Sequence, residues 1–123
     1  MNRELTSHRV NGLNEVLRIV VLDKPGPGDA CHRYRIEPTV GNAVGVVLEF
    51  QNGPLRETGG IPNGLSNESL LAIVEDRLLG FQSGNFSCRE NAVALTKIQE
   101  ALMWLQKRTR DRTARGVEGT NEA

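Results

Sequence analysis

The sequence has few cysteines, histidines and aromatic residues, and it has no long apolar run. Two cysteines, Cys31 and Cys88, and two histidines, His8 and His32, stand at spacings that match no metal-binding motif. We therefore expect no metal site, and free, reduced thiols in a cytoplasmic protein. Apolar runs reach only four or five residues, so the sequence predicts neither a signal peptide nor a membrane span.

The composition also excludes several classes of partner. With 123 residues, the chain has the size of one domain, 1–123, and its formal net charge is zero. A chain without net charge has no overall electrostatic attraction for polyanions or anionic lipids, so we expect no DNA, RNA or membrane partner. Only 38% of the residues are apolar and 4% are aromatic, which predicts a modest core that gains from oligomerisation.

The first half of the chain reads as an antiparallel β-meander over residues 13–52. Three strands are predicted, at 15–23, 30–37 and 43–51, because proline and glycine turns separate them. Side chains alternate onto one face of the second and third strands: His32, Tyr34 and Ile36, then Val44, Val46, Leu48 and Phe50. Three short strands with one apolar face need a cover, which the second half supplies.

The second half reads as an antiparallel helical hairpin over residues 65–116, followed by a tail at 117–123. Ser66 can cap a first helix that runs to about Gln82, while Ser87 and Glu90 have the spacing of a capping box for a second. Gly116 is a natural stop. The buried stripes are predicted at Leu70, Val74, Leu78 and Phe81 on the first helix, and at Leu95, Ile98, Leu102 and Leu105 on the second. The predicted fold class is α+β, with the sheet packed with the hairpin.

The second helix continues its apolar stripe with arginines. Positions 98, 101, 105, 108, 112 and 115 share one face, so Arg108 and Arg112 extend the seam. Cations near a helix C-terminus also complement the macrodipole, which is a sufficient structural explanation. However, arginine outnumbers lysine four to one over 107–115, and arginine favours bidentate phosphate contacts. With Arg56 at the same end of the hairpin, a cluster of three arginines is predicted.

The loop end of the hairpin carries Phe81, Phe86 and Asn91. These residues fit either of two roles. The aromatic residues belong to the core beside a helix cap, or the residues form a binding site for a purine, in which a ring stacks on the base and the amide hydrogen-bonds to the edge of the base. Asn91 and Arg108 are 17 residues apart, about 25 Å along a helix. One small ligand can therefore use both ends only across an antiparallel dimer.

The stretch from Leu48 onward resembles the phage and prophage Thoeris anti-defence proteins of the first type. The segments CRENAVALT and ALMWLQKRTRDRTARGVEGT carry the resemblance, and the hairpin is similar to that of the anti-CBASS cyclic-nucleotide sponges. The N-terminal stretch GPGDACHRYRI favours the Thoeris group over that sister group, which resembles an all-helical protein.

The resemblance implies a sponge: a protein that binds the cyclic ADP-ribose isomer of the Thoeris system without cleaving it. The resemblance implies that the protein uses no cofactor. It also implies dimers that group into a hexamer, with the signal bound at the dimer interfaces. Cyclic di- or trinucleotides are a second or main ligand in the alternative function, directed against CBASS. Carried over by position, Phe81 is the stacking aromatic and Asn91 a polar contact, while Arg56, Arg108 and Arg112 surround the ligand.

Two other classes of function fit the residues less well. Hydrolysis of the signal would need a metal cluster or a carboxylate with a raised pKa, whereas Glu68, Glu90 and Asp111 fit cap or surface positions. We therefore expect a binding protein and not an enzyme. A purely structural phage protein, whose hairpin only oligomerises, would tolerate a charge reversal at Arg108 with no change beyond solubility.

Overall fold

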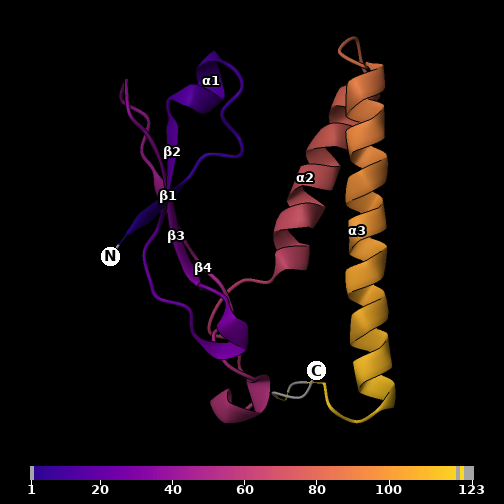
Figure 1. Cartoon of the computed structure of the whole chain (residues 1–123). Helices are drawn as coiled ribbons and strands as arrows, with labels where there is room; N and C mark the ends of the chain where they lie inside the picture. The colour runs from indigo at the N-terminus through magenta and orange to yellow at the C-terminus, as the bar shows by residue number, and fades with distance from the viewer. Residues whose placement is uncertain (1, 119, 121–123) are drawn as a thin grey trace. The chain divides into compact units, whose positions relative to one another are not determined.

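A computed structural model describes residues 2–118 and 120 (Figure 1). The chain divides into two compact units, Met1–Leu65 and Ser66–Ala123. The N-terminal unit is a β-sheet and the C-terminal unit is a pair of helices, so the α+β class is confirmed. The single domain over 1–123 and the packing of the sheet with the hairpin stay predictions. Within the described ranges, no helix is both long and apolar enough to cross a membrane.

The N-terminal unit is an antiparallel meander of four strands, where about three were predicted. The strands follow one another in the order β1 (Arg3–Leu5), β2 (Leu17–Val21), β3 (Arg33–Pro38) and β4 (Val46–Glu49). Three short helical segments connect or follow them: α1 (Gly12–Glu15), η1 (Pro27–Asp29) and η2 (Leu55–Thr58). The extra strand, β1, has only three residues and one apolar side chain, so it shows no alternation by which to predict it.

One face of the sheet is apolar, as the alternation predicts. Tyr34 pairs with Leu48, and Ile36 pairs with both Ile19 and Val46, so these side chains share a face. The rings of Tyr34 and Phe50 meet edge to face with their centroids 5.6 Å apart. Val44 does not extend this face, because it precedes β4 and is 93% exposed.

The opposite face carries ion pairs between strands. Arg18 pairs with Glu37, to which Arg35 also binds, and Arg33 pairs with Glu49. The hydrogen bond from Arg18 is the main cause that holds the pKa of Glu37 below its ordinary value, against an opposing effect of burial. Arg35 and Glu37 both belong to β3, whereas the Arg18–Glu37 and Arg33–Glu49 pairs join directly opposite residues of neighbouring strands and therefore support the register of β2, β3 and β4.

Asp23, just after β2, fixes the return of the chain into β3. Its carboxylate accepts the backbone N–H groups of His32 at 2.8 Å and Arg33 at 3.2 Å. Burial alone would raise the pKa of Asp23, but these hydrogen bonds outweigh it, and the pKa lies below its ordinary value. The ionised carboxylate therefore stabilises this turn.

The C-terminal unit is the predicted hairpin of α2 (Asn67–Gln82) and α3 (Arg89–Ala114), which pack antiparallel (Figure 1). Ser66 caps α2 as predicted, in a capping box with Ser69. The second predicted capping box is wrong. Cys88 is the N-cap of α3, and its Sγ accepts the backbone N–H of Asn91 at 3.4 Å, so Ser87 lies outside the helix. Glu90 then stands at the second helical position instead of the third, where a capping-box side chain belongs.

The end of α3 was predicted correctly. Gly116 has a φ of +74°, and its N–H donates to the carbonyl of Thr113, while Val117 donates to that of Arg112. These two bonds form a Schellman motif, in which a glycine in the left-handed region ends the helix. The chain after α3 therefore turns back toward the last helical turn.

The hairpin buries its apolar stripes only in part. Leu70, Leu78 and Leu95 are half-buried, whereas Val74 and Phe81 are exposed. No apolar side chain of α2 or α3 is fully buried, and the one buried residue of the two helices is Arg112. The two helices therefore leave apolar surface uncovered by each other.

Candidate functional site

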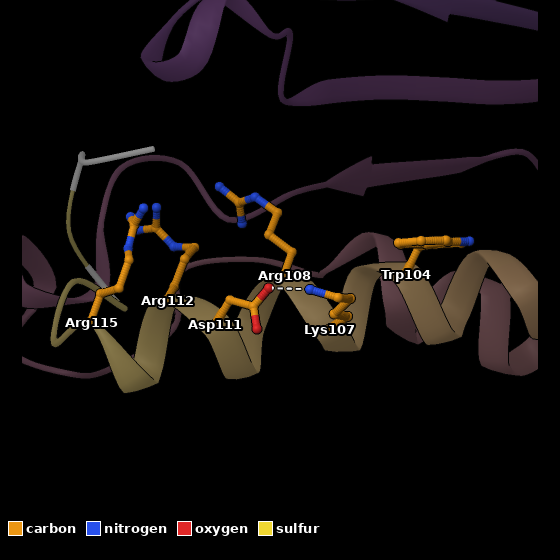
Figure 2. A pocket seen from close by; sticks show the side chains of 6 residues that line it. All are labelled: Trp104, Lys107, Arg108, Asp111, Arg112 and Arg115. Atoms are coloured by element: carbon orange, nitrogen blue, oxygen red, sulfur yellow. Dashed lines mark hydrogen bonds and ion pairs between the residues drawn. The ribbon is translucent and has the colours of Figure 1, made fainter.

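The C-terminal end of α3 carries an open pocket of about 260 Å³ (Figure 2). Six residues line it: Trp104, Lys107, Arg108, Asp111, Arg112 and Arg115. Their spacing of three and four residues places them on adjoining rows of one helix surface. The lining contains four cations and one carboxylate, so the pocket is strongly positive. It can attract an anion of nucleotide size.

Arg112 joins this pocket to the segment that follows α3, and it is only 5% exposed. Its Nη2 donates to the carbonyl oxygens of Val117 at 2.9 Å and Thr120 at 3.0 Å. The carboxylate of Glu118 lies 3.8 Å from its Nε. The sequence predicted Arg112 on the seam of the helix, but it did not predict that the segment after α3 folds onto it.

Two donors of Arg112 are buried without a hydrogen bond. Among the residues that the structure describes, neither Nε nor Nη1 donates to any acceptor. A buried charged donor without an acceptor is costly, and an anionic oxygen in the pocket would satisfy it. The guanidinium therefore holds the segment after α3 through Nη2 and faces the Glu118 carboxylate through Nε, which leaves Nη1 as the donor for an anion.

The other cations of the pocket differ in their partners. Lys107 donates to Asp111 at 2.6 Å in an i,i+4 pair, which uses the only carboxylate of the lining. The guanidinium of Arg108 is exposed and, within the described part of the chain, has no hydrogen-bond or ionic partner. Figure 2 shows Arg108, Arg112 and Arg115 rising from the same side of α3. Arg108 and Arg112 are thus brought together as predicted.

Trp104 was missed by the sequence reasoning. It stands one turn before Arg108, its side chain is 64% exposed, and it lines the same pocket. An exposed indole beside arginines offers a flat ring on which a base can stack. The signal was present in the sequence, because the single tryptophan lies four residues before Arg108.

The loop end of the hairpin holds the other predicted pair. Phe81 lies in the last turn of α2 and is 42% exposed, with the guanidinium of Arg77 over its ring at 5.6 Å. Asn91 is half-buried in the first turn of α3. Its side-chain amide makes no hydrogen bond with the described residues. A ring and a free amide thus lie at the same end, and Arg77 is a neighbour that the sequence did not predict.

The two ends of the hairpin are far apart, as predicted. Asn91 and Arg108 both lie on the unbroken helix α3, and 17 residues correspond to about 25 Å. Arg56 is exposed on η2, in the N-terminal unit. Its clustering with Arg108 and Arg112 stays a prediction, as do the roles of all five predicted ligand residues.

The chain is similar to a known protein family and to a known phage protein. Residues 44–110 match the family described as Acb2/Tad1, hairpin domain. Over 75 residues, the chain is 57% identical to "Thoeris anti-defense 1" of Bacillus phage SBSphiJ7, a match that covers 61% of this chain. It spans about half of that relative, 51% of its length. The resemblance given by the sequence is confirmed, and because the family match covers more than half of its residues, the chain belongs to the Acb2/Tad1 hairpin domain family.

Proposed function

We propose that this protein counters the Thoeris defence system by sequestering its signal, a cyclic ADP-ribose isomer, without cleaving it. The name of the Bacillus phage relative supports the anti-defence role. The carrying observation is the buried Arg112, whose Nη1 has neither an acceptor nor an ionic partner among the described residues, next to the exposed guanidinium of Arg108, which has none there either. The pyrophosphate of such a signal supplies anionic oxygens in the number that these donors require.

The adenine of the signal would bind at the other end of a hairpin. Phe81 offers a ring for stacking, and the free amide of Asn91 can form a bidentate pair with an adenine edge. Because these groups lie about 25 Å from Arg108 along α3, they come from a second copy of the chain. We propose an antiparallel dimer, three of which form a hexamer. Exposed apolar residues of the hairpin, among them Ile73, Val93 and Met103, favour such burial.

Binding without cleavage agrees with the chemistry of the pocket. The one carboxylate that lines it, Asp111, is engaged by Lys107 in an ion pair at 2.6 Å. General acid or base catalysis would instead favour a carboxyl group that is free to exchange its proton. The arginines supply affinity. Sequestration needs it, because the dissociation constant of a sponge must lie below the working concentration of the signal.

Cyclic di- or trinucleotides are the second candidate ligands. The cationic side chains of the pocket extend over about two helical turns, from Lys107 to Arg115, and several phosphodiester groups would follow that length more fully than one pyrophosphate. Trp104, one turn before Arg108, would stack on a base of such a ligand at the arginine end. This activity would be directed against CBASS.

Calorimetric titration tests both candidates. The purified protein is titrated with cyclic ADP-ribose isomers and, in parallel, with cyclic di- and trinucleotides. We expect nanomolar binding of at least one isomer, corresponding to about 12 kcal/mol. Sedimentation of the complex then measures the assembly. If no compound of either class binds, the proposed function is wrong; if only the cyclic oligonucleotides bind, the second candidate replaces the first.

A further inference from the structure

The loop that carries Arg56 is closed by a tight neck. It leaves the sheet after Phe50 and returns at Leu65, where the two residues form a parallel β-bridge. Gln51 N–H donates to the Leu65 carbonyl, and Leu65 N–H donates to that of Glu49, both at 2.8 Å. A Cβ at Gly64 would lie 2.4 Å from the carbonyl carbon of Phe50, so only glycine fits there. Both ends of the loop are therefore held against each other.

Asn63 closes this neck with its side chain. Its Oδ1 accepts the backbone N–H of Asn52 at 2.8 Å, and its Nδ2 donates to the carbonyl of Asn52 at 2.8 Å. The backbone N–H of Asn63 donates to Oε1 of Gln51 at 2.9 Å. The Nε2 of Gln51 donates in turn to the carbonyl of Gly53 at 3.1 Å. Two amide side chains thus satisfy the backbone on both sides of the neck.

The far part of the loop is also held by its own bonds. In η2, the Thr58 hydroxyl donates to the Leu55 carbonyl at 3.0 Å, and Gly60 N–H donates to the same oxygen at 2.8 Å. Gly59 ends this turn in the left-handed region with a φ of +68°. The guanidinium of Arg56, in contrast, is exposed and has no hydrogen-bond or ionic partner in the described chain. The hydrogen bonds of the neck and of η2 hold the loop in its own conformation, and the guanidinium of Arg56 takes no part in them.

We propose that Asn63 is a positioning residue for Arg56 and that the closed loop presents this guanidinium to the bound signal in a preformed position. This inference rests on the proposed function, because it takes the anionic signal as the partner of Arg56. An open loop would have to lose conformational freedom on binding, and a loop closed in advance avoids most of that loss. A preformed loop therefore raises affinity through Arg56 without Asn63 touching the ligand.

A double-mutant cycle tests this role in the full-length protein. The variants are Asn63→Ala, Arg56→Ala and the double substitution, with Asn42→Ala, an exposed turn residue of the same unit, as the matched control. We expect Asn63→Ala to weaken binding of the cyclic ADP-ribose isomer about tenfold, or about 1.4 kcal/mol. Arg56→Ala should weaken it at least as much, and the double variant should match Arg56→Ala alone.

Gln51→Ala removes the other half of the clamp and should show the same dependence on Arg56. It replaces Asn63→Ala if that variant does not fold. Hydrogen exchange supplies a readout without ligand. The backbone amide of Asn52, which is protected by Asn63 Oδ1, should exchange faster in Asn63→Ala than in the wild-type protein, whereas its exchange rate in Asn42→Ala should equal that of the wild type.

The outcomes separate this role from the proposed function. If the wild-type protein binds no nucleotide, the proposed function fails and the role of Arg56 fails with it. If the wild-type protein binds but Asn63→Ala binds equally well, only the positioning role is wrong. Equal losses from Asn63→Ala in the presence and absence of Arg56 would also overturn it, because the effect would then not pass through Arg56.

Discussion

Replacing Arg112 with lysine should both release the segment after α3 and weaken binding of the proposed signal. In the structure, Nη2 of Arg112 donates to two carbonyl oxygens, of Val117 and Thr120, and Nε faces Glu118, while Nη1 has no partner among the described residues and remains for an anion. Lysine keeps the positive charge but has a single nitrogen on a flexible stem. It cannot hold the segment and the anion in the same geometry.

The magnitude follows from the bonds that are lost. A hydrogen bond to a charged group is worth roughly 1.5–3 kcal/mol, so losing one bond to the anion should weaken binding about 10- to 150-fold. On the folded state the effect is smaller, because burial of the 5% exposed guanidinium is itself costly. We expect the free energy of unfolding to fall by about 1–2 kcal/mol.

Calorimetric titration and urea unfolding followed by circular dichroism measure the two effects. Arg110→Lys is the matched control, because Arg110 lies on the same helix end, is exposed and does not line the pocket. We expect the control to keep wild-type affinity and stability. Wild-type values of both quantities for Arg112→Lys would show that the several donors of the Arg112 guanidinium are unimportant, and would refute the reasoning.

Three further predictions follow from other parts of the molecule. Phe81→Ala and Arg108→Ala should each abolish signal binding in calorimetry while sedimentation still shows the oligomer; loss of folding in both would make these residues part of the core. Trp104→Ala should weaken ligands that stack at the arginine end by roughly 1–3 kcal/mol, and Trp104→Phe should retain most of the affinity. An equal loss in both variants would exclude stacking. The folded-state pKa values of Asp23 and Glu37 are lowered, so their contribution to stability is complete above their unfolded pKa values, about 4. It should be lost as the pH falls through the lower folded values, and unfolding curves of Asp23→Asn and Glu37→Gln should depend less on acid than the wild type.

Features with a local cause were predictable from the sequence. The Ser66 cap of α2 and the Gly116 stop of α3 each depend on a few neighbouring residues, and both were predicted correctly. The prediction of the start of α3 was wrong for a chemical reason, because a serine is usually a better N-cap than a cysteine. The chain nevertheless uses Cys88, and Ser87 lies outside the helix.

The candidate site was predictable only where it follows helical spacing. The 3.6-residue period placed Arg108 and Arg112 on one face, and the structure brings them into one pocket. That Arg112 binds the carbonyls after Gly116 depends on how the chain turns back, which spacing does not encode. The clamp of Asn63 on Asn52 joins residues 11 positions apart, and it likewise required the folded loop.

A mass balance of the signal tests the central claim most directly. A cyclic ADP-ribose isomer is mixed with a slight excess of the protein, the protein is removed by filtration, and the free signal is measured by chromatography. The retained protein is then heated, and the released compound is quantified. The account predicts that free signal nearly disappears and that heating returns it intact and in full, whereas Arg108→Ala leaves it in the filtrate. Signal that stays free with the wild-type protein, or a cleaved product after heating, would contradict sequestration without catalysis.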